Sequence, residues 1–138
     1  LLMGGDGLKE KDQLIAGAGG EAEGMYVTSI GRDVRDIPEA QSFVEKFEAQ
    51  YGAMSIFSGQ SYEAAKLLLA AVEKAGLVDG KVRREDVLKA VHEITYEGIL
   101  GFPISFDAKG DLVGGSVFVH QVRGDDFVQV KEYRTGEK

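Results

Sequence analysis

The stretch that decides the fold is LLMGGDG, residues 1–7, in which three consecutive apolar side chains run directly into a glycine-rich turn. An uninterrupted apolar run is typical of a strand that is buried on both faces of a parallel sheet. Glycine and aspartate then supply the backbone freedom and local hydrogen bonds that end such a strand. The stretch therefore predicts a buried strand with Asp6 at its carboxyl end. Because no initiator Met or lead-in loop precedes it, we expect the chain to be cut from a longer polypeptide.

Composition describes a globular chain and excludes several classes of function. Of 138 residues, 16 are basic and 23 acidic, which gives a net charge of −7, and 43% are hydrophobic. A pI near 4.8 argues against nucleic-acid binding, because phosphate is repelled by an acidic surface. No apolar run approaches the roughly 20 residues that cross a bilayer. The sequence has no cysteine, so it has neither disulfides nor thiolate chemistry.

The hydrophobic pattern changes period along the chain. A short helix is expected over residues 8–18, a strand over 24–29 and a charged connection over 30–37. Amphipathic helices with glycine stops are expected over residues 38–51, 62–75 and 84–91. From residue 96 the hydrophobic residues recur every second position, so residues 96–106 are expected to be strand-like and residues 107–111 to form a turn. A hairpin is expected to pair residues 117–122 with 127–130, and residues 133–138 are expected to form a polar tail. Strands mixed with helices in this way predict an α/β protein.

One glycine-rich loop has the letters of a dinucleotide-binding motif. GAGGEA, residues 17–22, matches G-x-G-x-x-A. The motif binds pyrophosphate only when a strand precedes it and a helix opens after it. Here residues 24–29 read as a strand, so a flexible loop is the favoured interpretation and an enzyme that uses a nucleotide is the weaker alternative.

Metal binding and catalysis find little support. Asp107, Lys109 and Asp111 alternate around a glycine but lack the further oxygen ligands of a calcium loop, so a hairpin turn is favoured. His92 and His120 are the only histidines and have no carboxylate cluster beside them in the sequence. We therefore expect no metal, no cofactor and no enzymatic activity.

Two residues are candidates for ligand binding. Asp6 is expected at the carboxyl end of a strand, the edge at which open α/β sheets bind ligands, and its carboxylate is suited to an ammonium group. The alternative for Asp6 is that it only stabilises the glycine turn. Phe57 lies just before a predicted helix and offers an aromatic wall to an apolar ligand, with core packing as its alternative.

The order of several motifs is more informative than any one of them. The most distinctive are AEGM at residues 22–25 and the pattern G-x-x-G followed by F-D-x-x-G-D over residues 98–111. The other matching stretches are residues 3–7, 43–52, 62–68 and 117–122. Together they resemble the C-terminal part of branched-chain amino-acid-binding proteins, the solute receptors of ABC importers, over nearly the whole chain.

The resemblance implies a type I periplasmic binding protein, in which two flavodoxin-like α/β lobes, joined by three crossovers, close over a ligand. This chain then contains only part of that fold. Residues 1–29 and 117–138 are expected in the C-terminal lobe and residues 30–116 in the N-terminal lobe. The expected hinge residues are Ser29, Ile30, Gly31, Ser116 and Val117.

The same resemblance implies a ligand and a partner. Asp6 matches the acidic residue that grips the ligand ammonium, where leucine-type receptors usually carry a glutamate that reaches about 1.5 Å further. Phe57 matches an aromatic pocket residue. The implied ligand is a branched-chain or other small amino acid or a related amide. The implied partner is the membrane permease of an ABC importer, and the implied location is periplasmic or extracellular and membrane-anchored.

Two further expectations concern alternatives and assembly. A ligand-sensing receptor domain of the same fold is the nearest alternative function, and a module that assembles through its apolar helices is another. Without the rest of the fold, the helices of residues 38–92 leave large apolar faces uncovered, which soluble monomers rarely do. We therefore expect this chain to form a homo-oligomer, with exchange of strands or domains as one form of it.

Overall fold

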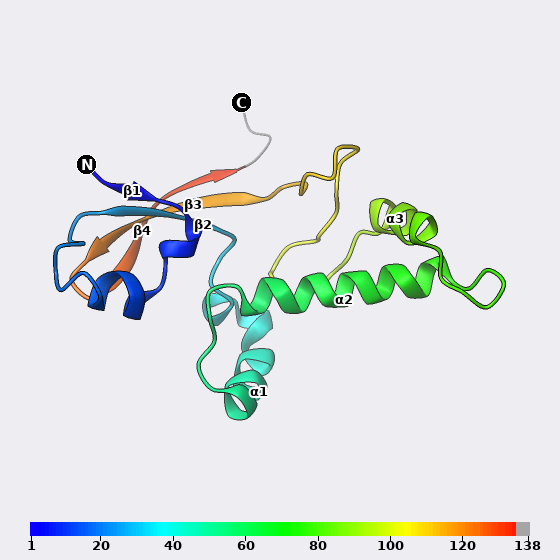
Figure 1. Cartoon of the computed structure of the whole chain (residues 1–138), viewed down its shortest axis with the longest axis horizontal. Coiled ribbons are helices and arrows are strands. Elements are labelled where there is room, and N and C mark those ends of the chain that lie inside the picture. Colours follow the sequence, from blue (N-terminus) through cyan, green and yellow to red (C-terminus); the bar gives the residue numbers. More distant parts are fainter. Residues whose placement is uncertain (135–138) are drawn as a thin grey trace. The chain divides into compact units, whose positions relative to one another are not determined.

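The chain divides into two compact units in a computed structural model that describes residues 1–134 (Figure 1). One unit contains Leu1–Arg32 together with the chain from Gly114 onward, and the other contains Asp33–Val113. The division lies within a few residues of the boundaries expected at 29/30 and 116/117. The assignment of the units to two receptor lobes stays a prediction, and each unit is described by itself.

The first unit is built on a four-stranded sheet in the order β1-β2-β3-β4. The strands are β1 (Met3–Gly4), β2 (Tyr26–Ile30), β3 (Ser116–Arg123) and β4 (Asp126–Arg134). β1 pairs with β2 in parallel, whereas β2 with β3 and β3 with β4 are antiparallel. The late hairpin is confirmed, and the opening strand is present but shorter than the apolar run suggests. The prediction that this strand is buried is wrong: Leu1, Leu2 and Met3 are each at least 60% exposed, because β1 lies at the edge of the sheet and pairs with β2 alone. The polar tail expected over 133–138 begins inside β4, and residues 135–138 lie outside the described residues.

One face of this sheet is buried. Val27, Phe118 and Val122 are at most 3% exposed and alternate along β2 and β3 with partly exposed residues. Such alternation is the result of the two-residue period of a strand. A π-helix, Lys11–Ala16, covers part of the face, and its Ile15 packs with Val122 in a small core. A 3₁₀-helix, Asp6–Leu8, precedes it. The prediction of a short helix over residues 8–18 is therefore confirmed, although the helix is a π-helix and spans only Lys11–Ala16.

The second unit is helical. After 3₁₀ turns at Val34–Asp36 and Pro38–Ala40 come α1 (Gln41–Tyr51), α2 (Ser58–Ala75) and α3 (Arg84–Glu93). α1 and α2 end at Gly52 and Gly76, whose φ angles of 83° and 67° fit only residues without a Cβ comfortably. All three predicted helices are confirmed, with α2 longer at its start than its apolar face indicates.

A single stripe of α2 is buried. Gly59, Glu63, Leu67 and Ala71 recur at every fourth position and are the buried residues of this helix. Glu63 is 1% exposed, and its Oε2 has no hydrogen-bond partner among the described residues. A Cβ at Gly98 would overlap this carboxylate. The glycine at position 98 therefore permits the backbone to approach the buried acid.

Residues 96–106 were expected to be strand-like, and here the structure differs. Only isolated bridges form, between Tyr96 and Ile104 and between Phe106 and Leu112. Pro103 has no N–H for a ladder, and Gly101 has a φ of 76°, so the chain turns before a second pair of residues can align. The expected turn at 107–111 is confirmed, because Asp107 Oδ1 accepts hydrogen bonds from the N–H groups of Lys109 and Asp111.

Replacement of Gly98 by alanine tests the close packing of Glu63. We expect Gly98→Ala to lower the free energy of unfolding by about 1–3 kcal/mol, because an added methyl group in a filled core forces side chains or backbone to shift. Chemical denaturation of the chain measures this. Gly5→Ala is the matched control, since Gly5 has a φ of −79° and its added Cβ meets nothing within 4 Å.

A double variant separates the clash from other effects of alanine at position 98. Glu63→Ala combined with Gly98→Ala removes the atoms that the new methyl group meets, so the loss caused by Gly98→Ala should shrink in that background. Equal losses in both backgrounds would contradict this account of Gly98.

Candidate functional site

Asp6 lies two residues beyond the end of β1, close to the carboxyl end at which the sequence predicts it. It is half-buried and begins the 3₁₀-helix Asp6–Leu8. Its Oδ1 accepts a hydrogen bond of 2.9 Å from the N–H of Gly7. This contact occupies one carboxylate oxygen in turn formation and leaves further acceptor capacity on the group. The geometry thus supports the turn-stabilising interpretation and is compatible with an ammonium ligand.

Phe57 directly precedes α2 and lies in the second unit. Its side chain is 38% exposed, so it is not a core residue. It lines a groove of about 440 Å³ between α1 and the beginning of α2. We call this the aromatic groove; its lining residues are Phe43, Phe47, Phe57, Tyr62, Ser55, Ser58 and Ser61. Asp6 belongs to the first unit and is not among them.

The other residues of the aromatic groove were missed as site candidates. The helical spacing of Phe43 and Phe47 predicts only the apolar stripe of a helix, and that of Tyr62 only the apolar face of α2. The sequence carries no signal that would have grouped these rings, because Phe57 lies outside both helices and its contact with them depends on how the chain packs.

The predicted hinge residues lie at the ends of two paired strands. Ser29 and Ile30 close β2, and Ser116 and Val117 open β3. Gly31, with a φ of 74°, donates its N–H to the carbonyl oxygen of Ser116 at 3.3 Å. The two segments that connect the units therefore leave the first unit next to each other, at the hydrogen-bonded ends of β2 and β3. Their role as a hinge stays a prediction.

A buried polar pair lies beside these strand ends. Ser29 Oγ and His120 Nε2 are 2.9 Å apart, and each residue is 7% exposed. Burial lowers the pKa of His120 to about 4, because the imidazolium loses its hydration, and the nearby charge of Lys9 lowers it further. His120 is therefore neutral near pH 7 and holds β3 to β2 through Ser29.

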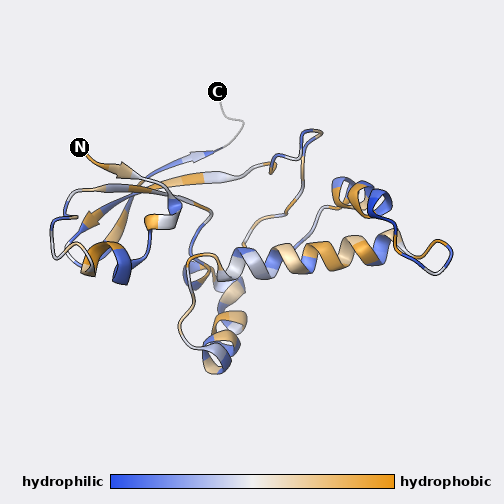
Figure 2. Cartoon of the chain, in the orientation of Figure 1, coloured by the Kyte–Doolittle hydropathy of each residue, from blue (hydrophilic) through white to orange (hydrophobic). Residues whose placement is uncertain are grey.

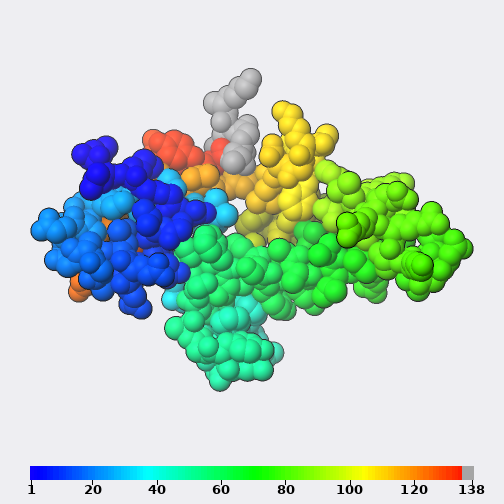
Figure 3. Space-filling model, viewed as in Figure 1, coloured from blue at the N-terminus to red at the C-terminus, as the bar shows by residue number. Residues whose placement is uncertain are grey.

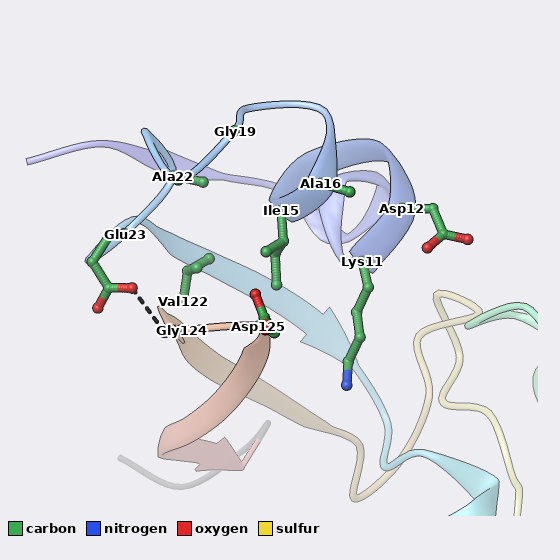
Figure 4. Close-up of a pocket in the computed structure, with 11 residues that line it drawn as sticks. Lys11, Asp12, Ile15, Ala16, Gly19, Ala22, Glu23, Val122, Gly124 and Asp125 are labelled. Carbon is green, nitrogen blue, oxygen red and sulfur yellow. Dashed lines mark hydrogen bonds between the residues drawn. The ribbon is translucent and has the colours of Figure 1, made fainter.

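A second cavity, of about 520 Å³, lies in the first unit beside the loop with the dinucleotide-like motif (Figure 4). Ile15 points from the π-helix toward Val122, and Gly19 lies on the loop above them. Glu23 Oε2 accepts a hydrogen bond of 2.8 Å from the N–H of Gly124. The charged residues that line this cavity are Lys11, Asp12, Glu23 and Asp125.

This cavity is poorly suited to a nucleotide. Three of its four charged residues are acidic, so a pyrophosphate group is repelled. The motif is followed by β2 rather than by a helix, and the helix N-terminus that normally meets the phosphates is missing from this position. The weaker alternative of a nucleotide enzyme gains no support from this loop.

The described residues contain neither a metal-binding cluster nor a membrane-spanning helix. Within residues 1–134 no group of three or more His, Asp or Glu side chains is arranged to hold a metal ion. None of the helices in this described part combines the length and apolar character needed to span a membrane.

The family of the chain follows from its sequence match. A family model described as periplasmic binding protein matches residues 4–126, which is most of the chain. The chain belongs to this family. A search of curated proteins finds no significant match to it.

Solved structures place the chain within a particular fold. It is similar to a leucine-binding protein from Thermotoga maritima MSB8, at 26% identity over 96% of this chain and 37% of that chain, with a TM-score of 0.74. It is also similar to a substrate-binding protein of an ABC transporter from Desulfitobacterium hafniense, solved in complex with leucine, at 25% identity over 94% of this chain and 35% of that chain, with a TM-score of 0.66. A branched-chain amino-acid ABC transporter protein from Thermus thermophilus with bound valine is 19% identical over 97% of this chain and 39% of that chain, with a TM-score of 0.64. This last likeness concerns the fold alone.

These similarities confirm the predicted fold class. The chain has the α/β fold of type I periplasmic binding proteins, of which it holds only a portion, because it spans 35–39% of the length of these three structures. The roles of Asp6, Phe57 and the hinge residues stay predictions.

The buried His120 makes stability depend on pH. Its pKa is about 4 in the folded chain and about 6.5 when unfolded, so the unfolded state binds more protons between these values. The stabilisation that neutral His120 gives to the folded state is fully present above pH 6.5 and is lost as the pH falls toward 4. We expect a loss of about 2 kcal/mol in the free energy of unfolding, after allowance for solvent screening.

Denaturation at pH 7 and pH 4.5 measures this loss, with His120→Gln as the comparison. Glutamine does not titrate and still offers Ser29 a hydrogen-bonding partner. The variant should lose less stability on acidification than the original chain. An identical pH dependence of the two would show that His120 is not the titrating group.

Proposed function

We propose that this chain forms part of the solute-binding component of an ABC importer, which binds a branched-chain or other small amino acid, or a related amide, between two lobes. The observation that carries the proposal is the family match over residues 4–126, which includes Asp6 at the end of β1. The leucine complex of the relative from Desulfitobacterium hafniense supports the ligand class.

The proposed mechanism is binding without chemical conversion. The ligand ammonium pairs with Asp6, and an apolar side chain of the ligand lies against Phe57. A ligand that contacts both units favours the closed arrangement over the open one by the difference in its affinity for the two. Ser29–Gly31 and Ser116–Val117 are the segments whose backbone angles change during closure.

The proposed partner is the membrane permease of the importer, which accepts the closed form. Such receptors work outside the cytoplasmic membrane, so the proposed location is periplasmic or extracellular with a membrane anchor. The acidic surface of this chain, with a net charge of −7, suits a protein that meets no nucleic acid.

Removal of the Asp6 charge tests the ligand site. In the natural product of the gene that encodes this chain, Asp6→Asn should weaken binding of leucine, valine or phenylalanine by about tenfold to a hundredfold, because the ligand ammonium loses its charged partner. Isothermal titration calorimetry with each amino acid and with short amides measures the affinity.

Asp12→Asn is the matched control, because Asp12 is an exposed acid of the same unit that has no predicted contact with ligand. It should leave affinity unchanged. An Asp6→Asn variant with unaltered affinity would show that Asp6 only stabilises its turn, and no binding of any of these ligands would overturn the proposed function.

We further propose that the 138-residue chain by itself associates with a second copy. The support is the set of large apolar side chains that α2 and α3 leave exposed, among them Leu68 at 51%, Leu69 at 65% and Leu88 at 61%. Figure 2 shows hydrophobic residues along α2, and Figure 3 shows this helix uncovered on the face in view. Apolar surface of this kind drives association in water.

Light scattering of the isolated chain tests association. The expected mass is at least twice the 14.9 kDa of one chain. Leu69→Lys should shift the population toward the monomer, because a charge on the contact surface is costly to bury. Leu112→Lys, at a residue outside the helices that is 37% exposed, is the control and should leave the mass unchanged. A monomeric mass for the unaltered chain in dilute solution would contradict the proposal.

A further inference from the structure

The chain contains two Asp–Gly pairs, Asp6–Gly7 and Asp79–Gly80. An aspartate can close a ring with its own backbone when the amide nitrogen of the next residue attacks the side-chain carboxyl carbon. A following glycine favours this reaction, because it has no Cβ to crowd the nitrogen and it has the widest choice of backbone angles. Whether such an aspartate reacts then depends on where the folded chain places that nitrogen.

At Asp6 the two reacting groups lie against each other. Asp6 Oδ1 accepts a hydrogen bond of 2.9 Å from the N–H of Gly7. Because Cγ is bonded to Oδ1, the same contact holds the Gly7 nitrogen beside Cγ. Two groups held together in this way react as though at a high effective concentration. The contact joins neighbouring residues of one 3₁₀ turn, so it depends on no other element of the fold.

The turn also leaves room for the ring. Asp6 is half-buried and lies between Gly5 and Gly7. A Cβ built at either of these glycines meets no atom within 4 Å. The backbone on both sides of Asp6 is therefore able to shift during ring closure without displacing neighbouring side chains.

Two other aspartates each meet only one of these requirements. Asp126 Oδ1 accepts a hydrogen bond of 2.7 Å from the N–H of Phe127, but the phenylalanine side chain crowds that nitrogen. Asp79 is followed by glycine, but its carboxylate is directed to Arg83, with 3.4 Å between Asp79 Oδ2 and Arg83 Nη2. Of these three aspartates, Asp6 alone combines the contact with a following glycine.

We propose that Asp6–Gly7 is a site of spontaneous covalent modification, at which Asp6 isomerises to isoaspartate. The Gly7 nitrogen bonds to Cγ of the protonated carboxyl group, and the carboxyl hydroxyl and the amide proton leave together as water. The resulting succinimide ring then takes up one water. Cleavage between the nitrogen and Cγ restores aspartate, whereas cleavage between the nitrogen and the main-chain carbonyl carbon of Asp6 gives isoaspartate.

The product displaces the charge that the proposed ligand site uses. In isoaspartate the main chain runs through Cγ and is one methylene longer, and the free carboxylate is attached directly to Cα. This consequence rests on the proposed function, in which Asp6 pairs with the ligand ammonium. The isomerisation itself does not rest on it.

Prolonged incubation of the natural gene product in neutral buffer, followed by proteolysis and mass spectrometry, measures the reaction. Isoaspartate leaves the mass of a peptide unchanged but alters its retention and fragmentation, and the succinimide is lighter by one water. We expect the peptide with Asp6 to convert several-fold faster than the peptide with Asp79, and the peptide with Asp126 to stay unconverted. Conversion at Asp6 that is no faster than at Asp79 would overturn the inference.

Incubation in concentrated urea separates structure from sequence. Both Asp–Gly pairs should then convert at similar rates, because the folded turn that holds Gly7 against Asp6 is lost. An equally large difference between Asp6 and Asp79 in urea would show that the turn is not its cause.

A variant tests the attacking nitrogen. Gly7→Ala should slow the conversion of Asp6 several-fold, because the methyl group crowds this nitrogen while it meets no other atom of the fold. Gly5→Ala is the matched control, since it removes the glycine on the other side of Asp6 and should leave the rate nearly unchanged. Equal rates in the two variants would contradict the proposed attack by Gly7.

Calorimetry with leucine on fresh and on aged protein separates this inference from the proposed function. The fraction of protein that binds leucine should fall as the isoaspartate fraction rises. Isomerised protein that still binds leucine would support the modification site and contradict the role of Asp6 in the ligand site. Leucine binding without any conversion at Asp6 would overturn the inference and leave the receptor function intact.

Discussion

The pairing of β2 with β3 is the contact on which the path of this chain depends. Val27 lies opposite His120 and Ser29 opposite Phe118, so two segments far apart in sequence become neighbours. All residues of the second unit, Asp33–Val113, are inserted between these two strands. Both ends of that insertion are therefore held at one place in the first unit.

The same strand pair explains why a polar pair is tolerated inside the first unit. The buried face of β2 and β3 consists of aliphatic and aromatic side chains apart from Ser29 and His120. Ser29 Oγ and His120 Nε2 satisfy each other at 2.9 Å, whereas His120 Nδ1 is buried without a side-chain hydrogen-bond partner among the described residues. Burial keeps His120 uncharged, so no counter-charge is needed in the core.

The two units contribute to the proposed receptor in different ways. In the first unit, turn chemistry fixes the position of Asp6, because its carboxylate accepts a hydrogen bond from the N–H of Gly7 in the 3₁₀ turn. In the second unit, helix geometry fixes the rings, because residues one turn apart lie on one face.

Hydrophobic periodicity by itself determined the three helices, the β3–β4 hairpin and the turn at Asp107, because each depends on contacts within a few residues. The order of several short motifs along the chain, such as AEGM at residues 22–25, was enough to indicate the family. Residues 96–106 form isolated bridges instead of strands, since Pro103 and Gly101 prevent a continuous ladder. Tertiary structure alone placed the carboxylate of Glu63 against Gly98 and Phe57 beside the rings of α1. Each of these contacts joins residues of different segments whose separation along the chain has no period, so no local pattern predicts them.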